Sequence, residues 1–207
     1  MPWESTLQQV LDCSYAGLER AQIRWAVIGS PASALQGCRI VPRDIDILVM
    51  APEYVRRFAE FMTSYTPPVC AHSTDEDDWH SSREYPVDAG PDDYGFVWHF
   101  ARWYVDGFKV EVAHILPPEG FPTASSGAGI WEAGSEIWPH VKRIPFAGYQ
   151  VPVVPLEIQL ETNLTRGLRE RVQAIITVFQ ERGYDPTLAR RSLRSSHREA
   201  VEKLIQL

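Results

Sequence analysis

The sequence predicts an α+β fold in which a mixed β-sheet carries flanking helices and the chain ends in a helical part. Three observations support this. Apolar runs typical of strands alternate with helical patterns in the first half, two hairpin signals follow, and apolar residues then recur every three or four positions. At 207 residues the chain is long enough to bury a sizeable core. We expect the core over residues 1–154 and the helical part over residues 155–207.

The first half of the chain predicts helices and strands in alternation. Residues 5–20 keep apolar side chains at helical spacing, and residues 23–28 form a run of β-forming residues that a Gly-Ser pair ends. Small residues over 31–37 predict a short helix, residues 44–50 a second strand, and Pro52 begins a third helix. The order of elements is therefore helix, strand, helix, strand, helix.

The second half predicts two hairpins followed by helices. Two-residue turns at Asp106-Gly107 and Ala147-Gly148 join strands that we place over residues 97–105, 108–115, 141–146 and 149–154. The acidic stretch 72–95 is expected to be an exposed insertion, and the Pro-, Gly- and Ser-rich stretch 117–136 a loop. Three helices are expected to follow, the first from Pro155 to the residue before Gly183, the others from Pro186 and Ser196.

Composition argues against several classes of protein. The formal net charge of −7 argues against an extended nucleic-acid-binding surface, which is usually basic. No apolar run reaches the ~18 residues of a membrane-spanning helix. The three cysteines are widely spaced, with no Cys-x-x-Cys pair, and indicate reduced thiols in a cytoplasmic protein.

Two carboxylates on one predicted strand are the most informative feature of the sequence. Asp44 and Asp46 alternate with Ile45 and Ile47, so both aspartates face one side, with Cα atoms about 6.5–7 Å apart. Aspartate is a poor strand former, and two like charges on one face repel each other. A bound divalent cation would relieve this cost, so the pair is a candidate metal site.

A Gly-Ser pair ends the preceding strand and opens the short helix. Gly29 would let the backbone approach a ligand closely, Ser30 offers a hydroxyl, and a helix N-terminus favours phosphate. A phosphate site and a metal site would thus lie at neighbouring strand ends. The residues alone leave open a structural coincidence, because single Asp-x-Asp and Gly-Ser pairs are common in solvated turns and edges.

The combined pattern resembles the opening signature of the nucleotidyltransferase superfamily, which has a polymerase-beta-like fold. Residues 27–37 read VIGSPASALQG, Arg39 follows, and residues 42–49 read PRDIDILV. In that superfamily a hydrophobic strand leads to Gly-Gly or Gly-Ser and then to Asp-x-Asp or Asp-x-Glu on the next strand. The resemblance is to bacterial members of the aminoglycoside-nucleotidyltransferase-like and abortive-infection-toxin-like branches. It implies a mixed-sheet nucleotidyltransferase core.

The resemblance also implies a set of catalytic carboxylates. Asp44 and Asp46 would act with a third carboxylate on a later strand, for which Glu111 is the candidate. These three would bind one or two Mg²⁺ ions, with Mn²⁺ as an alternative, and Glu111 would double as general base. Glu111 also falls opposite Arg102 across the first hairpin, so a cross-strand ion pair is the alternative interpretation.

The implied reaction is transfer of a nucleoside monophosphate from an NTP to an unknown small-molecule, protein or RNA acceptor. Gly29, Ser30 and Arg43 would contact the nucleotide. The sequence departs from the family over residues 156–172, which contain arginines such as Arg166 but no lysine. The alternative is therefore a catalytically degenerate relative that binds a nucleotide or a partner protein, as in a toxin–antitoxin pair. A hydrolase or phosphotransferase using the same metal site is a third hypothesis.

Overall fold

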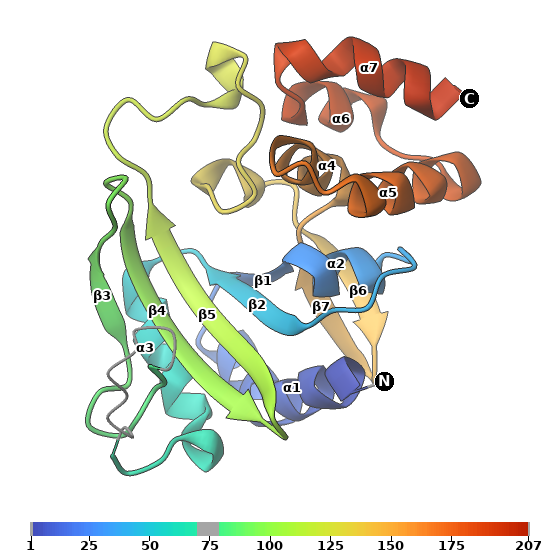
Figure 1. The fold of residues 1–207 in the computed structure, drawn as a ribbon. Coiled ribbons are helices and arrows are strands. Elements are labelled where there is room, and N and C mark those ends of the chain that lie inside the picture. The colour runs from blue at the N-terminus through green and yellow to red at the C-terminus, as the bar shows by residue number, and fades with distance from the viewer. Residues whose placement is uncertain (1, 70–78, 207) are drawn as a thin grey trace.

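The described residues form one mixed seven-stranded sheet with helices packed against it, which confirms the predicted fold class (Figure 1). The computed structural model describes residues 2–69 and 79–206. The strands follow the order β3-β4-β5-β2-β1-β7-β6 across the sheet. Their bounds are β1 Trp25–Ile28, β2 Asp44–Val49, β3 Asp88–Pro91, β4 Val97–Val105, β5 Phe108–Leu116, β6 Lys142–Phe146 and β7 Tyr149–Val153.

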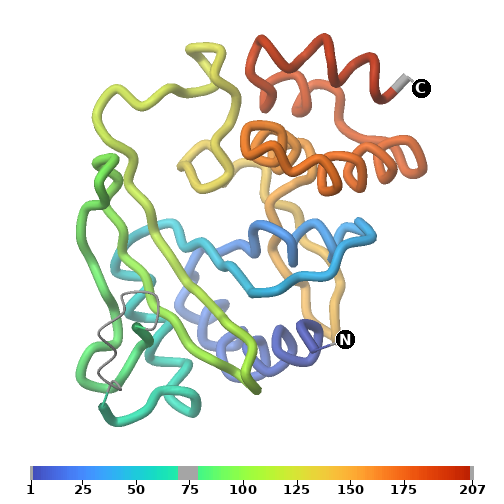
Figure 2. Tube along the Cα trace, viewed as in Figure 1, coloured from blue at the N-terminus to red at the C-terminus, as the bar shows by residue number. Residues whose placement is uncertain are grey.

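Two groups of helices flank the sheet. Helices α1 and α3 pack together against one face, whereas α4 to α7 form a separate layer at the top of the view in Figures 1 and 2. Helix α2 lies beside β1 and β2 and also contacts α4. The helix bounds are α1 Pro2–Arg20, α2 Gly29–Leu35, α3 Pro52–Phe61, α4 Leu156–Thr165, α5 Arg169–Arg182, α6 Pro186–Ser192 and α7 Ser195–Gln206. Short 3₁₀ turns are η1 Thr63–Tyr65, η3 Ala124–Ser126 and η4 Ser135–Ile137.

Three apolar clusters hold these layers together. Ile45 and Ile47 point into the largest cluster, which lies between the sheet and helices α1 and α3. Leu48 belongs to a second cluster, which includes Ile158 of α4. A third cluster lies among the C-terminal helices around Leu160. The predicted alternation along β2 is therefore confirmed, and Asp44 and Asp46 share the face of Leu48. The boundary at residue 154 stays a prediction.

Both predicted hairpins are present. Asp106 and Gly107 have φ values of 51° and 77°, and Ala147 and Gly148 have values of 47° and 85°. Positive φ at both central residues is the geometry of a type I′ turn, whose twist matches that of the strands it joins. The β4–β5 hairpin places Arg102 opposite Glu111, as the sequence predicted.

The single helix expected after Pro155 is wrong, because the chain breaks there into α4 and α5. Gly167 follows α4 with φ of 67°, in the left-handed region that glycine adopts without strain. The amide of Gly167 donates to the carbonyl of Leu164, and the amide of Leu168 donates to the carbonyl of Asn163. This pair of bonds is a Schellman motif, which ends a helix although the apolar spacing continues.

The insertion expected over residues 72–95 is exposed over most of residues 83–95, but it contains a strand that the sequence did not predict. β3 is the edge strand of the sheet, and Ser81 and Ser82 are buried. The Ser81 amide donates to the carbonyl of Arg102, whose own amide donates to the Ser81 hydroxyl. Backbone pairing to β4 outweighs the weak strand preference of Gly and Pro, which an edge position tolerates. Residues 72–78 lie outside the described residues.

The stretch over residues 117–136 is a loop, as predicted, and crosses from the sheet to the C-terminal helices (Figure 2). It contains η3 and the start of η4. The amide of Ile130 donates to the carbonyl of Ser192, and the amide of Ser195 donates to the carbonyl of Gly127. This loop is therefore joined to α6 and α7 through backbone hydrogen bonds.

Two remaining sequence expectations concern the chain as a whole. Cys13 and Cys38 are free thiols, and Cys70 lies outside the described residues. Over residues 2–69 and 79–206, no helix combines the length and the apolar character that a membrane crossing requires.

Candidate metal and nucleotide site

Three neighbouring strands bring the predicted acidic residues together. β2 runs parallel to β5, which places Asp46 beside Glu111 and Asp44 beside Lys109. β1 runs antiparallel along the other edge of β2, with Ile28 beside Asp46. Gly29, which follows Ile28 in the chain, begins α2. The strand end that carries Gly29 and the strand that carries the aspartates are therefore adjacent, as the sequence predicted.

A cavity opens over these strands. Gly29, Asp44, Asp46 and Glu111 line it, and its volume of about 600 Å³ suits a small-molecule ligand. Other side chains in its wall come from β4, from the loop and from α4, and include Trp98, Phe100, Trp131, Glu132, Thr162 and Arg166. The cavity thus combines carboxylates, aromatic rings and two arginines, Arg102 and Arg166.

Two of the predicted nucleotide-binding residues lie apart from this cavity. Ser30 is buried in the first turn of α2, with 3% of its surface exposed. Arg43 is exposed immediately before β2. Neither side chain is among those that line the carboxylate cavity. Their contact with a nucleotide stays a prediction.

Gly29 allows close packing against the central carboxylate. Its φ of 63° lies in the left-handed region, and a Cβ atom at this position would lie 3.2 Å from Oδ2 of Asp46. The Gly29 amide donates to Oε1 of Glu132 at 2.8 Å. Ile28, at the N-cap of α2, offers no side-chain acceptor. Glu132 therefore takes the place of a capping side chain for this helix.

Asp46 lies in an unfavourable electrostatic environment. Burial raises the pKa of its carboxyl to about 7, with further increases from the charges of Asp44, Glu111 and Glu132, while Lys109 acts in the opposite direction. Several carboxylates thus share a space in which the ionised form of Asp46 is costly. A bound cation would lower this cost.

Glu111 is held by two cationic side chains. Nε and Nη2 of Arg102 both lie 2.7 Å from its Oε1, and Nζ of Lys109 lies 2.9 Å from its Oε2. Lys109 also lies 4.0 Å from Oδ2 of Asp44. The ion pair that the sequence left as an alternative is present, but it is partly buried, with 14% of the Arg102 side chain and 22% of the Glu111 side chain exposed.

Comparison with known proteins identifies the fold. No protein-family model and no curated protein matches the sequence. The solved structure of TM1012 from Thermotoga maritima, a proposed nucleotidyltransferase, matches with a TM-score of 0.57 and 21% identity, over 87% of this chain and 94% of that one. The chain has the nucleotidyltransferase fold. The antibiotic-resistance factor ANT(2'')-Ia also matches, with a TM-score of 0.42 and 12% identity, over 98% of this chain and 97% of that one.

Three residues of this nucleotidyltransferase-fold site were missed from the sequence. Glu132 comes from a stretch that predicted only a loop, and Lys109 was considered only as part of a strand. Arg166 was noted only as one of the arginines in a stretch that lacks lysine, and it lines the carboxylate cavity. Burial raises the pKa of Glu132, against the opposing effects of hydrogen bonds with Gly29 and Thr162. The Gly-rich loop around Glu132 offered no periodic pattern that could have placed it.

The metal-ligand set of Asp44, Asp46 and Glu111 stays a prediction. Within the described part of the chain, no group of three or more His, Cys, Asp or Glu side chains is arranged as a metal site. Glu111 faces Arg102 and Lys109 instead. The chemistry of the donor set nevertheless suits a hard cation, because carboxylate oxygens are the ligands that Mg²⁺ prefers. Asp44 and Asp46 are the two aspartates that would hold it.

We expect Gly29→Ala to destabilise the protein and to weaken nucleotide binding. The left-handed φ alone would cost about 1 kcal/mol, and the new methyl group would press on Asp46. Gly107→Ala is the matched control, since Gly107 has φ of 77° but no atom within 4 Å of its added Cβ. Denaturant unfolding and nucleotide titration of both variants measure the difference. Equal losses of stability and of nucleotide affinity in the two variants would contradict a special role for the contact with Asp46.

Proposed function

We propose that the protein is a metal-dependent nucleotidyltransferase that transfers a nucleoside monophosphate from an NTP to a hydroxyl group of an acceptor. The observation that carries this proposal is the meeting of Gly29, Asp44, Asp46 and Glu111 in one cavity of a nucleotidyltransferase fold. The crowded carboxylates need positive charge, which the divalent ions that accompany a triphosphate would bring. The free thiols of Cys13 and Cys38 are consistent with the cytoplasmic location expected from the sequence.

The residues of the cavity have distinct proposed roles. Asp44 and Asp46 would hold Mg²⁺, or Mn²⁺ as an alternative, and the ion would neutralise phosphate charge and polarise the reacting oxygens. Arg166, which lies at the C-terminal end of α4 and lines the cavity, would face the triphosphate. It would supply part of the charge that the absent lysine of residues 156–172 cannot.

The proposed reaction is a displacement at the α-phosphorus. The acceptor oxygen forms a bond to that phosphorus, the bond to the bridging oxygen breaks, and pyrophosphate leaves with the electron pair. Glu111 is the proposed acceptor of the hydroxyl proton. Its bonds to Arg102 and Lys109 fix the position of the carboxylate, and Oε2, the oxygen that contacts Lys109, has a second lone pair for a proton.

A second candidate function is nucleotide or partner binding without catalysis. The observation that favours it concerns Glu111, the proposed third metal ligand. Both of its carboxylate oxygens already contact cationic side chains, so Glu111 is less available to a metal ion. Under this alternative the carboxylate cavity would bind a nucleotide or a partner protein, as in a toxin–antitoxin pair. It would do so without releasing pyrophosphate.

The test is a calorimetric titration with ATP, GTP, CTP and UTP, each with Mg²⁺. We expect the wild-type protein to bind at least one nucleotide in a metal-dependent way and the Asp44→Asn/Asp46→Asn variant to lose this binding. Asp93→Asn is the control, because Asp93 is an exposed carboxylate in the turn before β4. Absence of nucleotide binding by folded wild-type protein would overturn the enzymatic proposal. Binding without pyrophosphate release in an acceptor screen would favour the second candidate.

A further inference from the structure

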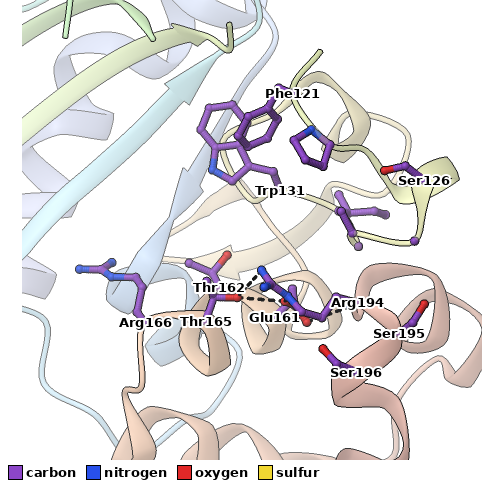
Figure 3. A pocket seen from close by; sticks show the side chains of 15 residues that line it. Phe121, Ser126, Trp131, Glu161, Thr162, Thr165, Arg166, Arg194, Ser195 and Ser196 are labelled. Atoms are coloured by element: carbon purple, nitrogen blue, oxygen red, sulfur yellow. Dashed lines mark hydrogen bonds and ion pairs between the residues drawn. The ribbon is translucent and has the colours of Figure 1, made fainter. Parts of the chain in front are cut away.

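A second and larger cavity lies beside the carboxylate cavity, between the loop over residues 117–136 and the C-terminal helices (Figure 3). Its volume of about 930 Å³ is in the range of sites that enclose a whole small molecule. Phe121 and Trp131 lie on one side of it, and Glu161, Thr165 and Arg194 lie on the other. We call it the loop–helix cavity.

The two cavities are adjacent and share part of their walls. Trp131, Thr162 and Arg166 line both the loop–helix cavity and the carboxylate cavity. A ligand seated in the loop–helix cavity can therefore extend one group toward Asp44 and Asp46. The carboxylate cavity also has aromatic residues of its own, Trp98 and Phe100, so a nucleotide does not need the rings of the second cavity.

Aromatic rings form the loop side of this cavity. Phe96, Phe121 and Trp131 pack on one another with ring centroids 5.1 to 5.4 Å apart. Each ring thereby fixes the orientation of the others. Phe121 and Trp131 are only partly buried and line the cavity. Such rigid ring faces favour a planar ring in the ligand.

The helix side of the cavity carries hydroxyl groups and arginines rather than an available carboxylate. Glu161, with 6% of its side chain exposed, accepts hydrogen bonds from Nε of Arg194 at 2.5 Å and from the Thr165 hydroxyl at 2.9 Å. Its Oε2 accepts from the Arg194 amide and lies 3.0 Å from Nδ1 of His197. Both oxygens are thus engaged within the protein. Arg166 adds positive charge to the same wall.

We propose that the loop–helix cavity binds the acceptor, and that the acceptor is an uncharged or anionic molecule with a planar ring. The ring would lie against Phe121 and Trp131, and the reacting hydroxyl would extend past Thr162 toward the aspartates. A polycationic acceptor does not suit this cavity, because Arg166 would repel it and the charge of Glu161 is already neutralised by Arg194. The identification of this ligand as the acceptor rests on the proposed transferase function. The binding of a planar ring in the cavity does not depend on that function.

The experiment uses naphthalenesulfonate as an anionic ring, naphthol as a neutral ring and naphthylmethylamine as a cationic ring. Binding to the full-length protein is followed by NMR through the indole N–H signal of Trp131, assigned with Trp131→Phe. Phe121→Ala removes a ring of the cavity, and Ser196→Trp fills the cavity from an exposed position on α7. Phe100→Ala is the matched control, because Phe100 lines only the carboxylate cavity. Thermal unfolding shows whether each variant is folded.

We expect the anionic and neutral rings to bind more tightly than the cationic ring. Phe121→Ala and Ser196→Trp should each weaken that binding about tenfold, the scale of one lost ring-stacking contact, whereas Phe100→Ala should not. Absence of ring binding by the wild-type protein, or wild-type affinity in both Phe121→Ala and Ser196→Trp, would overturn the site. Tighter binding of the cationic ring would overturn the charge assignment.

A second experiment tests whether the ring that binds in this cavity belongs to the acceptor or to the nucleobase. Mg²⁺ and ATP, or the nucleotide that binds in the titration above, are added to the protein already holding naphthalenesulfonate. Simultaneous binding supports an acceptor site. Competition, together with weaker nucleotide binding by Phe121→Ala, would show that the cavity holds the nucleobase and would overturn the acceptor assignment. If no nucleotide binds at all, the transferase function fails while the ring titrations still test the cavity.

Discussion

Asp46→Asn is expected to abolish metal-dependent nucleotide binding and at the same time to stabilise the metal-free protein above neutral pH. In the folded protein, burial and the nearby carboxylates raise the pKa of Asp46 to about 7 from its ordinary value of 3.8. The folded state therefore holds this proton more strongly than the unfolded state does. Between pH 3.8 and about pH 7, the contribution of Asp46 to the stability of the fold therefore falls as pH rises.

The size and the pH window of this effect follow from the shift. Each pKa unit corresponds to about 1.4 kcal/mol, so a rise from 3.8 to about 7 means that the ionised carboxylate costs on the order of 4 kcal/mol above neutral pH. Asparagine has a similar shape but does not ionise. In EDTA at about pH 8, we expect the variant to unfold at higher denaturant concentration than the wild-type protein, and this difference to vanish near pH 4.

Asp93→Asn, on an exposed turn, is the control for this measurement and should leave the unfolding midpoint unchanged at both pH values. A variant that is less stable than wild type at the higher pH would contradict the electrostatic cost assigned to Asp46. Gain of stability with loss of binding is the behaviour expected of a residue retained for function at the expense of the fold.

The sequence was sufficient to predict the fold class and most of the framework of the site. Strict alternation along β2 and two-residue turns with positive φ are local signals, and both predictions are confirmed. The pairing of Arg102 with Glu111 followed from counting residues back from the Asp106-Gly107 turn. In each case a short-range rule was enough, because neighbouring residues alone determine the geometry.

The errors arose where distant parts of the chain determine the structure. β3 forms because the edge of β4 is available to it, and the residues of β3 themselves have little strand preference. Glu132 reaches the Gly29 amide across a separation that no periodic pattern encodes. The break at Gly167 was within reach of a local rule, but the continuous apolar spacing on both sides of it favoured a single helix.

Lys109 has the second of the two largest expected effects. Its ammonium group lies 2.9 Å from Oε2 of Glu111 and 4.0 Å from Oδ2 of Asp44, so it neutralises oxygens that a metal ion would also use. Burial lowers the pKa of Lys109, but the hydrogen bond to Glu111 and the charges of Glu111 and Asp44 outweigh this and raise it overall. The ammonium group therefore stays charged at neutral pH and competes with any cation at this position.

We expect Lys109→Met to tighten the binding of Mn²⁺ by about tenfold or more, since a unit charge a few Å away contributes on the order of 1–3 kcal/mol at a partly exposed site. Titration of free Mn²⁺ by electron paramagnetic resonance, without nucleotide, measures the affinity and the number of ions bound. Lys203→Met is the control, because Lys203 and its partner Glu199 are both exposed side chains of α7. Unchanged or weaker Mn²⁺ binding by Lys109→Met would mean that Lys109 does not compete for the metal position. Appearance of a second bound ion would instead show that Lys109 occupies the place of that ion in the wild-type protein.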